Sequence, residues 1–505
     1  MKTLFGIILA LLLVASFMTW KSLPERVSDA PLIYWVTDGN PARVEQIRTF
    51  RTWLKENGHP DIEAQVDTVN VSPEKILVQG VSGVAGDLLD HTGGSSMRFR
   101  NAVGLLEDVT EAAKEMGFDV SKTFAVLQAE LTVNGKQFAF PSNVSSDAMW
   151  VNVEAFENVG MEPPPKQWTF ETFEAIGKEF VKRANTQDTG ALRRYFFLPD
   201  VDVTVMARTM GGAIYNETQS ACVIDSAGYR RALGLRYKWT YEDRLLPTTA
   251  DKGSFSSTSG YGGANFALFA QGNFALVRSG RWASIAFRQY TDDRRKAGRE
   301  PLKLAVSEDP YGKFRCSTGY TRATAMYAGG KQKDLAKYFM AYLASKEYNM
   351  NIVNDGDALP PNPIYTKTEE FLYPKDRPEE WTNSWGSVHG TFANIMEELG
   401  ISPEFSPFVL DSVAERYIRE TSDKYMNNML TLEASTAHMQ KLITDELKRS
   451  LEEDPSIVPL YEQRVALQQQ IDALRAAGEK VPLSWITNPY WRHYYLTHNL
   501  ADETK

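Results

Sequence analysis

Apolar residues recur along the chain in the alternating and helical patterns of a mixed α/β fold. Leu32 to Val36 is a β-prone run that ends in a turn sequence, residues 38–41. A helix follows from about Ala42, and residues 62–71 then alternate like a second strand. The apolar face expected for this helix holds Val44, Ile47, Phe50 and Leu54. This β-α-β order predicts a parallel sheet covered by helices.

Two later segments carry strong helix signals. The Thr169 hydroxyl can cap a helix, and Trp168 and Phe173 occupy the two positions of a hydrophobic staple across its start. A second helix is expected from about Lys333, with an apolar face of Leu335, Tyr338, Phe339, Tyr342 and Leu343. We interpret both faces as packing surfaces.

The last 70 residues, 436–505, are named here the C-terminal extension. One amphipathic helix is expected through Met439, Leu442, Ile443, Leu447 and Leu451, and another through Leu460, Leu467, Ile471 and Leu474. Pro455 and Pro459 are expected to interrupt the two helices. We expect the aromatic-rich residues 485–495 to fold back onto a core, which predicts an extension packed on the second half of the molecule.

The first segment indicates where the protein works. Lys2 precedes an apolar run from Leu4 to about Met18, the pattern of an export signal. The run reaches Trp20, so residues 1–30 are interpreted as either a signal peptide or an N-terminal membrane anchor, with a tether through residues 4–20 in the second case. No later stretch has about 18 uninterrupted apolar residues. We therefore expect a periplasmic or extracytoplasmic protein.

Composition narrows the functional classes. The 505 residues are 43% hydrophobic and 24% charged, which favours a globular chain of two lobes. The net charge of −9, without a dense basic stripe, argues against nucleic acid as a partner. The two cysteines, Cys222 and Cys316, could pair or remain separate buried thiols, and we expect a monomer.

Several spaced segments between residues 31 and 365 resemble the family 1 extracellular solute-binding proteins, the sugar-binding subunits of ABC importers. Their order and spacing carry the resemblance more than any single segment does. The segments are residues 32–38, 76–90 (ILVQGVSGVAGDLLD), 104–109, 134–141, 149–160, 164–171, 269–282 (FAQGNFALVRSGRW), 336–345 and 356–360.

The resemblance implies a periplasmic-binding-protein type II-like α/β fold, with two α/β lobes joined by hinge strands and a ligand cleft between them. It implies a first lobe of residues 31–140 and 318–356 and a second lobe of residues 141–317 and 357–435. It also implies permease subunits of an ABC importer as partners and no cofactor. The chain departs from the family in lacking a lipid-anchor cysteine, in the stretch 367–385, and in the C-terminal extension.

A sugar site needs planar aromatic side chains beside polar groups, because sugars present hydroxyls and C–H faces. Trp35 and Asp38 end the first predicted strand, where open α/β sheets place their ligands. Asp87 and His91 belong to the next strand, before the loop Gly93-Gly94. A core ring, a helix cap and a structural histidine are the alternatives for Trp35, Asp38 and His91.

Further candidates lie in the second half of the site. The resemblance places ligand contacts at Asn143, Asp147 and Trp150, after the first hinge, and implies that Trp282 stacks on the sugar. Arg281 is expected to pair with a carboxylate or an acidic ligand. Tyr261 and Tyr320 follow glycines in loops suited to a closing cleft, with simple surface exposure as the alternative.

An enzymatic role is disfavoured because the chain lacks a His-Glu-x-x-His motif, a Gly-x-Ser-x-Gly elbow and a Walker loop. We therefore expect a solute-binding protein that delivers a carbohydrate or oligosaccharide to an ABC importer. A membrane-tethered ligand sensor for a signalling partner and a hydrolase with paired carboxylates are the alternatives.

Overall fold

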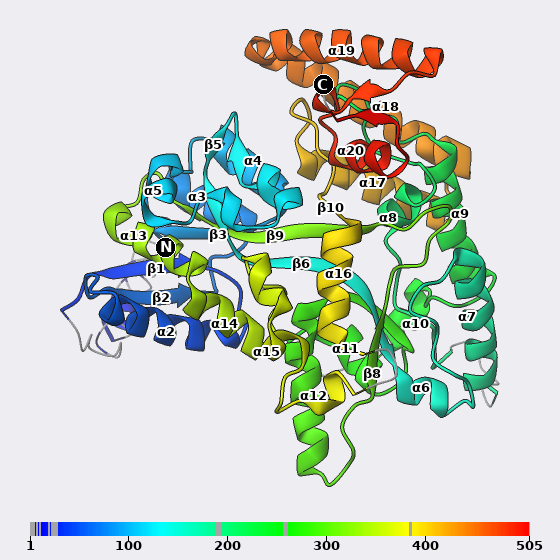
Figure 1. Ribbon diagram of the computed structural model, residues 1–505, viewed down its shortest axis with the longest axis horizontal. Helices are drawn as coiled ribbons and strands as arrows, with labels where there is room; N and C mark the ends of the chain where they lie inside the picture. The colour runs from blue at the N-terminus through cyan, green and yellow to red at the C-terminus, as the bar shows by residue number, and fades with distance from the viewer. Residues whose placement is uncertain are drawn as a thin grey trace.

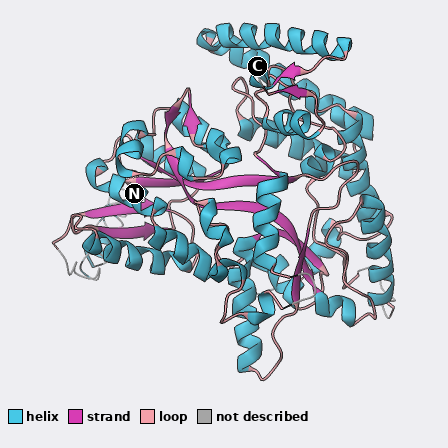
Figure 2. Cartoon of the chain, in the orientation of Figure 1, coloured by secondary structure: helices cyan, strands magenta, loops and turns pink. Residues whose placement is uncertain are grey.

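The computed structural model describes residues 6, 9, 12–18, 21, 29–186, 193–255, 261–382 and 386–503. A central sheet of eight strands runs through the molecule, and helices cover both of its faces (Figures 1 and 2). The strand order is β2-β1-β3-β9-β6-β7, with β10 paired to β9 and β8 paired to β6. Within the described ranges, no helix combines the length and the apolar character needed to cross a membrane.

The first lobe is built on three parallel strands, β1 (Leu32–Val36), β2 (Glu63–Asp67) and β3 (Leu88–Thr92). Successive residues of β1 and β3 alternate between two buried apolar clusters, one on each face of the sheet, as expected of strands covered on both sides. The covering helices are α2 (Ala42–Glu56), α3 (Pro73–Val81), α4 (Gly93–Ala102), α5 (Thr110–Met116), α13 (Lys333–Ala344) and α14 (Lys346–Asp355).

Two long strands connect this lobe to the rest of the molecule. β6 (Ala139–Asn152) and β9 (Ser317–Met326) pair antiparallel, and both cross the middle of the structure (Figure 1). One end of β9 pairs with β3 and the other with β10 (Gly400–Ile401). The far half of β6 pairs with β7 (Leu276–Gly280) and β8 (Leu304–Ser307).

The second lobe forms around that far half of β6. Met149 and Val151 enter one apolar cluster, and Ala148 and Trp150 enter another on the opposite face, following the period of two. The helices of this lobe are α6 (Val153–Glu157), α7 (Phe170–Ala184), α8 (Val203–Arg208), α9 (Ala227–Tyr241), α10 (Thr249–Ser254), α11 (Gly263–Ala270), α12 (Ser284–Lys296), α15 (Glu369–Leu372) and α16 (Val388–Leu399).

The chain ends in four helices beside the second lobe. They are α17 (Asp411–Met426), α18 (Leu432–Glu453), α19 (Val458–Ala477) and α20 (Pro489–Thr497). Met439, Ile443 and Leu447 of α18 belong to a core cluster of the second lobe, and Tyr490 of α20 is fully buried. Small two-stranded sheets join β11 (Val481–Pro482) to β12 (Ala501–Asp502) and β4 (Thr132–Val133) to β5 (Lys136–Gln137).

Most of the predicted elements form. The strand at 32–36, the helix from Ala42, the capped helix after Thr169 and the helix from Lys333 are all present. The predicted staple is also present, because the rings of Trp168 and Phe173 lie 5.2 Å apart. Cys222 and Cys316 are free and buried.

Two details of the prediction are wrong. Val44 is 78% exposed instead of facing the core, because Arg43 and Gln46 occupy the buried side of α2. Pro459 lies in the first turn of α19 instead of interrupting a helix, since a first-turn proline gives up no helical hydrogen bond.

Candidate functional site

A polar surface lies where β6 and β9 cross between the two lobes. Directly paired residues of antiparallel strands share a face of the sheet, and the pairs here are Asn143 with Arg322 and Ser145 with Tyr320. Asp147 continues this face toward the second lobe, where it pairs with Gly280. We call this surface the polar floor. It interrupts the apolar strand pattern midway between two cores.

The first-lobe side of the floor is a network of charges. The Arg322 guanidinium lies 2.8 Å from Asp38 and 3.1 Å from Asp90, and Asp38 also pairs with Arg43 at 2.9 Å. Arg43 in turn lies 3.2 Å from Asp357. Burial alone would raise the pKa of Asp38, but Arg43 and Arg322 outweigh it and hold that pKa below its usual range. Asp38 therefore remains an anionic acceptor.

An aromatic wall faces this network from the second lobe. Trp282 follows β7 in a short 3-10 turn, and its ring lies 6.0 Å from that of Tyr261 and 5.3 Å from that of Phe266. Gly280 allows this close packing, since a Cβ there would lie 2.2 Å from Oγ of Ser145 and 2.7 Å from Cδ1 of Trp282. Burial, followed by the charges of Asp357 and Asp38, raises the pKa of Tyr261.

The second-lobe end of the floor holds another arginine. Arg278 lies 2.9 Å from Asp147, 3.4 Å from Asp202 and 2.9 Å from Asp309. Tyr320 donates its hydroxyl to Asp147 at 3.3 Å. Burial raises the pKa of Asp147, and Arg278 counteracts this. The polar floor thus has a charge network at each end, one around Arg322 in the first lobe and one around Arg278 in the second.

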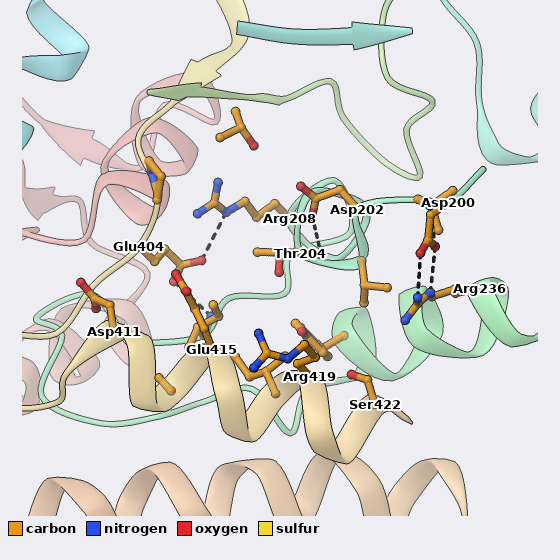
Figure 3. Close-up of a pocket in the computed structure, with 18 of the residues that line it drawn as sticks. Asp200, Asp202, Thr204, Arg208, Arg236, Glu404, Asp411, Glu415, Arg419 and Ser422 are labelled. Atoms are coloured by element: carbon orange, nitrogen blue, oxygen red, sulfur yellow. Dashed lines mark hydrogen bonds and ion pairs between the residues drawn. The ribbon is translucent and has the colours of Figure 1, made fainter. Parts of the chain in front are cut away.

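A cavity of about 780 Å³ opens beyond Arg278. Its walls come from the start of α8, from α9 and from α17, which carry Thr204, Arg236 and Glu415 (Figure 3). Thr318 of β9 also lines it. The polar lining includes four arginines, Arg208, Arg236, Arg278 and Arg419. Pockets of this size and mixed lining are typical of small-molecule sites.

The start of α17, which lines the cavity, also contacts the first lobe. Arg98 of α4 lies 3.3 Å from Asp411, the first residue of α17, and its guanidinium lies 3.5 Å from the centre of the Phe405 ring. Burial raises the pKa of Asp411 to about 6, although Arg98 counteracts this. α17 therefore contacts both lobes beside the cavity.

Six of the residues proposed from the sequence are brought together here. Four lie on the polar floor or its charged end, and two form the aromatic wall. They are Asp38, Asn143, Asp147 and Tyr320, and Tyr261 and Trp282.

Three other candidates lie in the interior. Trp35 is fully buried and donates its indole N–H to Asp90 at 2.7 Å. Trp150 packs 5.1 Å from Phe287 and donates to the Gly280 carbonyl at 3.1 Å. Both rings have their hydrogen-bonding group satisfied by the protein and leave no face for a solute.

Arg281 is also internal and serves the hinge. It is 1% exposed and donates to His389 at 2.8 Å and to the Ala358 carbonyl at 2.7 Å. Burial, followed by the charge of Arg288, lowers its pKa to about 9. The expected pairing with an acidic ligand has no support in this position.

The two candidates around β3 are separated from the floor. Asp87 precedes β3 and accepts from the Tyr34 backbone N–H at 3.0 Å, roughly 16 Å from Thr92 at the other end of the strand. His91 is 3% exposed, and burial lowers its pKa well below the usual value. Neither side chain belongs to the polar floor or the aromatic wall.

Sequence reasoning missed the arginines of the site, Arg322, Arg278 and Arg208. Arg322 belongs to the alternating run Thr318, Tyr320, Arg322, which is visible in the sequence. Arg278 interrupts the apolar strand 276–280, and a charge in a buried strand is a signal of pairing. Arg208 lies in a helix with no comparable signal.

Comparisons with known proteins agree with this architecture. Residues 42–350 match the family model of the bacterial extracellular solute-binding proteins. A search of curated proteins found no match.

Solved structures share the fold at low sequence identity. An ABC substrate-binding protein from Listeria monocytogenes in complex with cycloalternan is 19% identical, with a TM-score of 0.67 over 83% of this chain and 100% of that chain. A maltose/maltodextrin-binding domain from Bdellovibrio bacteriovorus bound to maltotriose is 14% identical, with a TM-score of 0.62 over 83% and 100%. A Mycobacterium tuberculosis protein in complex with glycerophosphocholine is 12% identical, with a TM-score of 0.64 over 84% and 100%.

Proposed function

Because the chain belongs to the bacterial extracellular solute-binding protein family, we propose that it captures a carbohydrate or oligosaccharide and delivers it to an ABC importer. Members of this family bind and release their solute without converting it, so the role is not enzymatic. Two structural neighbours are bound to cycloalternan and to maltotriose, which supports a carbohydrate as the solute.

The observation that carries the proposal is the pairing of an aromatic wall with a charged network across the polar floor. Trp282 and Tyr261 supply planar faces, while Asp38 and Arg322 supply an acceptor and a donor opposite them. Asp38 is 26% exposed and Arg322 is 20% exposed, so both can reach a solute. This combination matches the C–H faces and hydroxyls of a sugar ring.

The proposed binding event is closure of the two lobes around the sugar. The strands β6 and β9 connect the lobes, so bending within them moves Asp38 and Arg322 relative to Trp282. The sugar contributes contacts to both walls at once, which favours the closed arrangement over the open one.

The proposed site includes the cavity of about 780 Å³ beside Arg278. Its volume exceeds that of a single sugar ring, which supports an oligosaccharide as the solute. One part of the oligosaccharide would then bind against Trp282 and another part beside α17.

Delivery requires the protein to remain near its importer. The apolar residues before residue 21 are proposed to hold the protein at the membrane or to direct its export, and the permease subunits are the proposed partners.

Thermal unfolding in the presence of a solute panel tests the proposal. The panel comprises maltose, maltotriose, maltotetraose, cycloalternan, tagatose and glycerophosphocholine. A solute that binds only the folded protein raises Tm by mass action, and the stabilisation grows with the logarithm of the ratio of its concentration to Kd. A rise with at least one sugar and recovery of that sugar intact afterwards are expected. An unchanged Tm with every sugar contradicts the proposal.

A further inference from the structure

We propose that Arg208 binds the solute and that the C-terminal extension positions it; this inference rests on the proposed carbohydrate-binding function. Arg208 ends α8 and lines the cavity, yet its side chain is only 2% exposed (Figure 3). Such a buried arginine is costly unless its donors are satisfied.

Only part of the Arg208 guanidinium is used by the protein. Its Nε donates to Oε1 of Glu404 at 3.3 Å. Within the described ranges, Nη1 and Nη2 of Arg208 make no hydrogen bond. The guanidinium therefore presents unused donors in a fixed fork, a geometry that binds two neighbouring oxygen atoms.

Glu404 holds that fork in place. Its side chain is fully buried, and its second oxygen, Oε2, accepts from the backbone N–H groups of Ile214 at 3.0 Å and Tyr215 at 3.2 Å. Oε2 also accepts from Nδ2 of Asn488 at 3.0 Å. A carboxylate with this many donors cannot turn away from Arg208 without losing several bonds.

The C-terminal extension supplies the remaining support. Asn488 is fully buried at the start of α20, and Tyr490 donates its hydroxyl to the Arg208 carbonyl at 2.9 Å. The Tyr490 ring centre lies 5.9 Å from the Arg208 guanidinium. Glu217 fixes the extension further, by accepting from Arg475 and from Tyr495, each at 2.8 Å.

The surroundings favour a neutral solute at Arg208. Arg236 is already paired with Asp200, and Arg278 is paired with three carboxylates. The lining also contains Asp411 and Glu415, whose pKa values burial raises. Because six carboxyl groups and four arginines line the cavity, we assign the fork to two adjacent hydroxyl oxygens of a neutral sugar.

Calorimetric titration of the full-length protein with the six solutes of the panel, and with galacturonic acid, tests this assignment. Arg208→Met removes the fork and keeps most of the side-chain volume, so we expect Kd for the tightest sugar to rise about 10- to 100-fold. The matched control is Arg294→Met on α12, which breaks a pair with Glu154 of α6 and does not line the cavity. The control should leave Kd unchanged.

A double-mutant cycle separates positioning from a general loss of stability. Asn488→Ala should raise Kd about 3- to 10-fold in the native background and have no further effect in the Arg208→Met background. A purely structural role would give additive effects. Tyr490→Phe, which removes one hydroxyl, serves as the milder variant if Asn488→Ala does not fold, with the same expectation.

The outcomes distinguish this inference from the proposed function. A protein that binds a panel sugar equally well with and without Arg208 overturns the inference and leaves the proposed function standing. A protein that binds none of the sugars overturns both. Tighter binding of galacturonic acid than of every neutral sugar overturns the assignment to hydroxyls.

Discussion

Replacement of Trp282 by alanine should weaken sugar binding more than it weakens folding. The ring is only partly covered by the protein, by Tyr261 and Phe266, so one surface is left for a solute. Trp282→Ala removes the stacking surface without opening a fully enclosed cavity.

The expected loss follows from the uncovered part of the ring. A contact area of roughly 50 Å² at about 25 cal/mol per Å² gives about 1.3 kcal/mol. The stacking geometry adds about 0.5–1.5 kcal/mol. The sum, about 2–3 kcal/mol, corresponds to a Kd that is about 30- to 150-fold higher.

Calorimetry with the tightest panel sugar measures this loss, with Tm recorded for each variant. Trp282→Phe keeps a ring and should recover part of the affinity. Trp381→Phe, which alters a ring that donates to the Pro374 carbonyl outside both the aromatic wall and the C-terminal extension, is the control. An unchanged Kd for Trp282→Ala would refute the stacking role.

Three further predictions concern the site and its supports. Gly280→Ala places a methyl group 2.2 Å from the Ser145 hydroxyl of the polar floor and 2.7 Å from the Trp282 ring, so it should raise Kd at least about 10-fold in the same titration. An unaltered Kd would contradict a binding site at the junction of floor and wall. Arg278→Ala leaves three carboxylates without their cation and should lower the free energy of unfolding by about 3–5 kcal/mol in urea titrations, whereas a change below about 1 kcal/mol would contradict it. Burial raises the pKa of Glu130 from 4.5 to about 7, so its protonation favours the folded state below pH 4.5 and that contribution is lost as pH rises through 7. Relative to Glu130→Gln, the free energy of unfolding of the native protein should fall by up to about 3 kcal/mol between pH 5 and pH 8. Parallel curves of unfolding free energy against pH for the two proteins would contradict this.

The fold could largely be predicted because local patterns and global packing agree in the first lobe. Ile33 and Trp35 enter one apolar cluster and Val36 enters another, and the helix after this strand is stopped by Gly58. The same agreement explains the Trp168–Phe173 staple. Such signals depend on residues that are close in the sequence, so one amino-acid sequence is enough to find them.

The prediction failed where a long-range charge network overrides the apolar pattern. Val44 has the spacing of a core residue, but Arg43 takes the buried side of α2 because Asp38 and Asp357 lie there. Asp357 is 314 positions away from Arg43, and no pattern within the helix indicates it. Buried charges are paired, and the partner decides which face turns inward.

For a related reason, the sequence alone could only partly distinguish binding-site residues from core residues. Aromatic residues at strand ends occur both in cores and in sugar sites, so Trp35 and Trp282 look alike in sequence. In the structure Trp35 is fully buried, whereas Trp282 remains partly open. Arg208 depends on Glu404 and Asn488, from two separate segments, and becomes recognisable only when these meet.

Closure of the two lobes around a sugar is the central claim, and an inter-lobe distance measures it. Spin labels at V78C on α3 and K182C on α7 would report on the two lobes, since both native side chains are highly exposed. Cys222 and Cys316 should stay unlabelled because both are buried and burial raises each thiol pKa to about 12. We predict a single, shifted and narrower distance distribution with saturating sugar. A distribution that stays the same while calorimetry shows full occupancy would contradict the account.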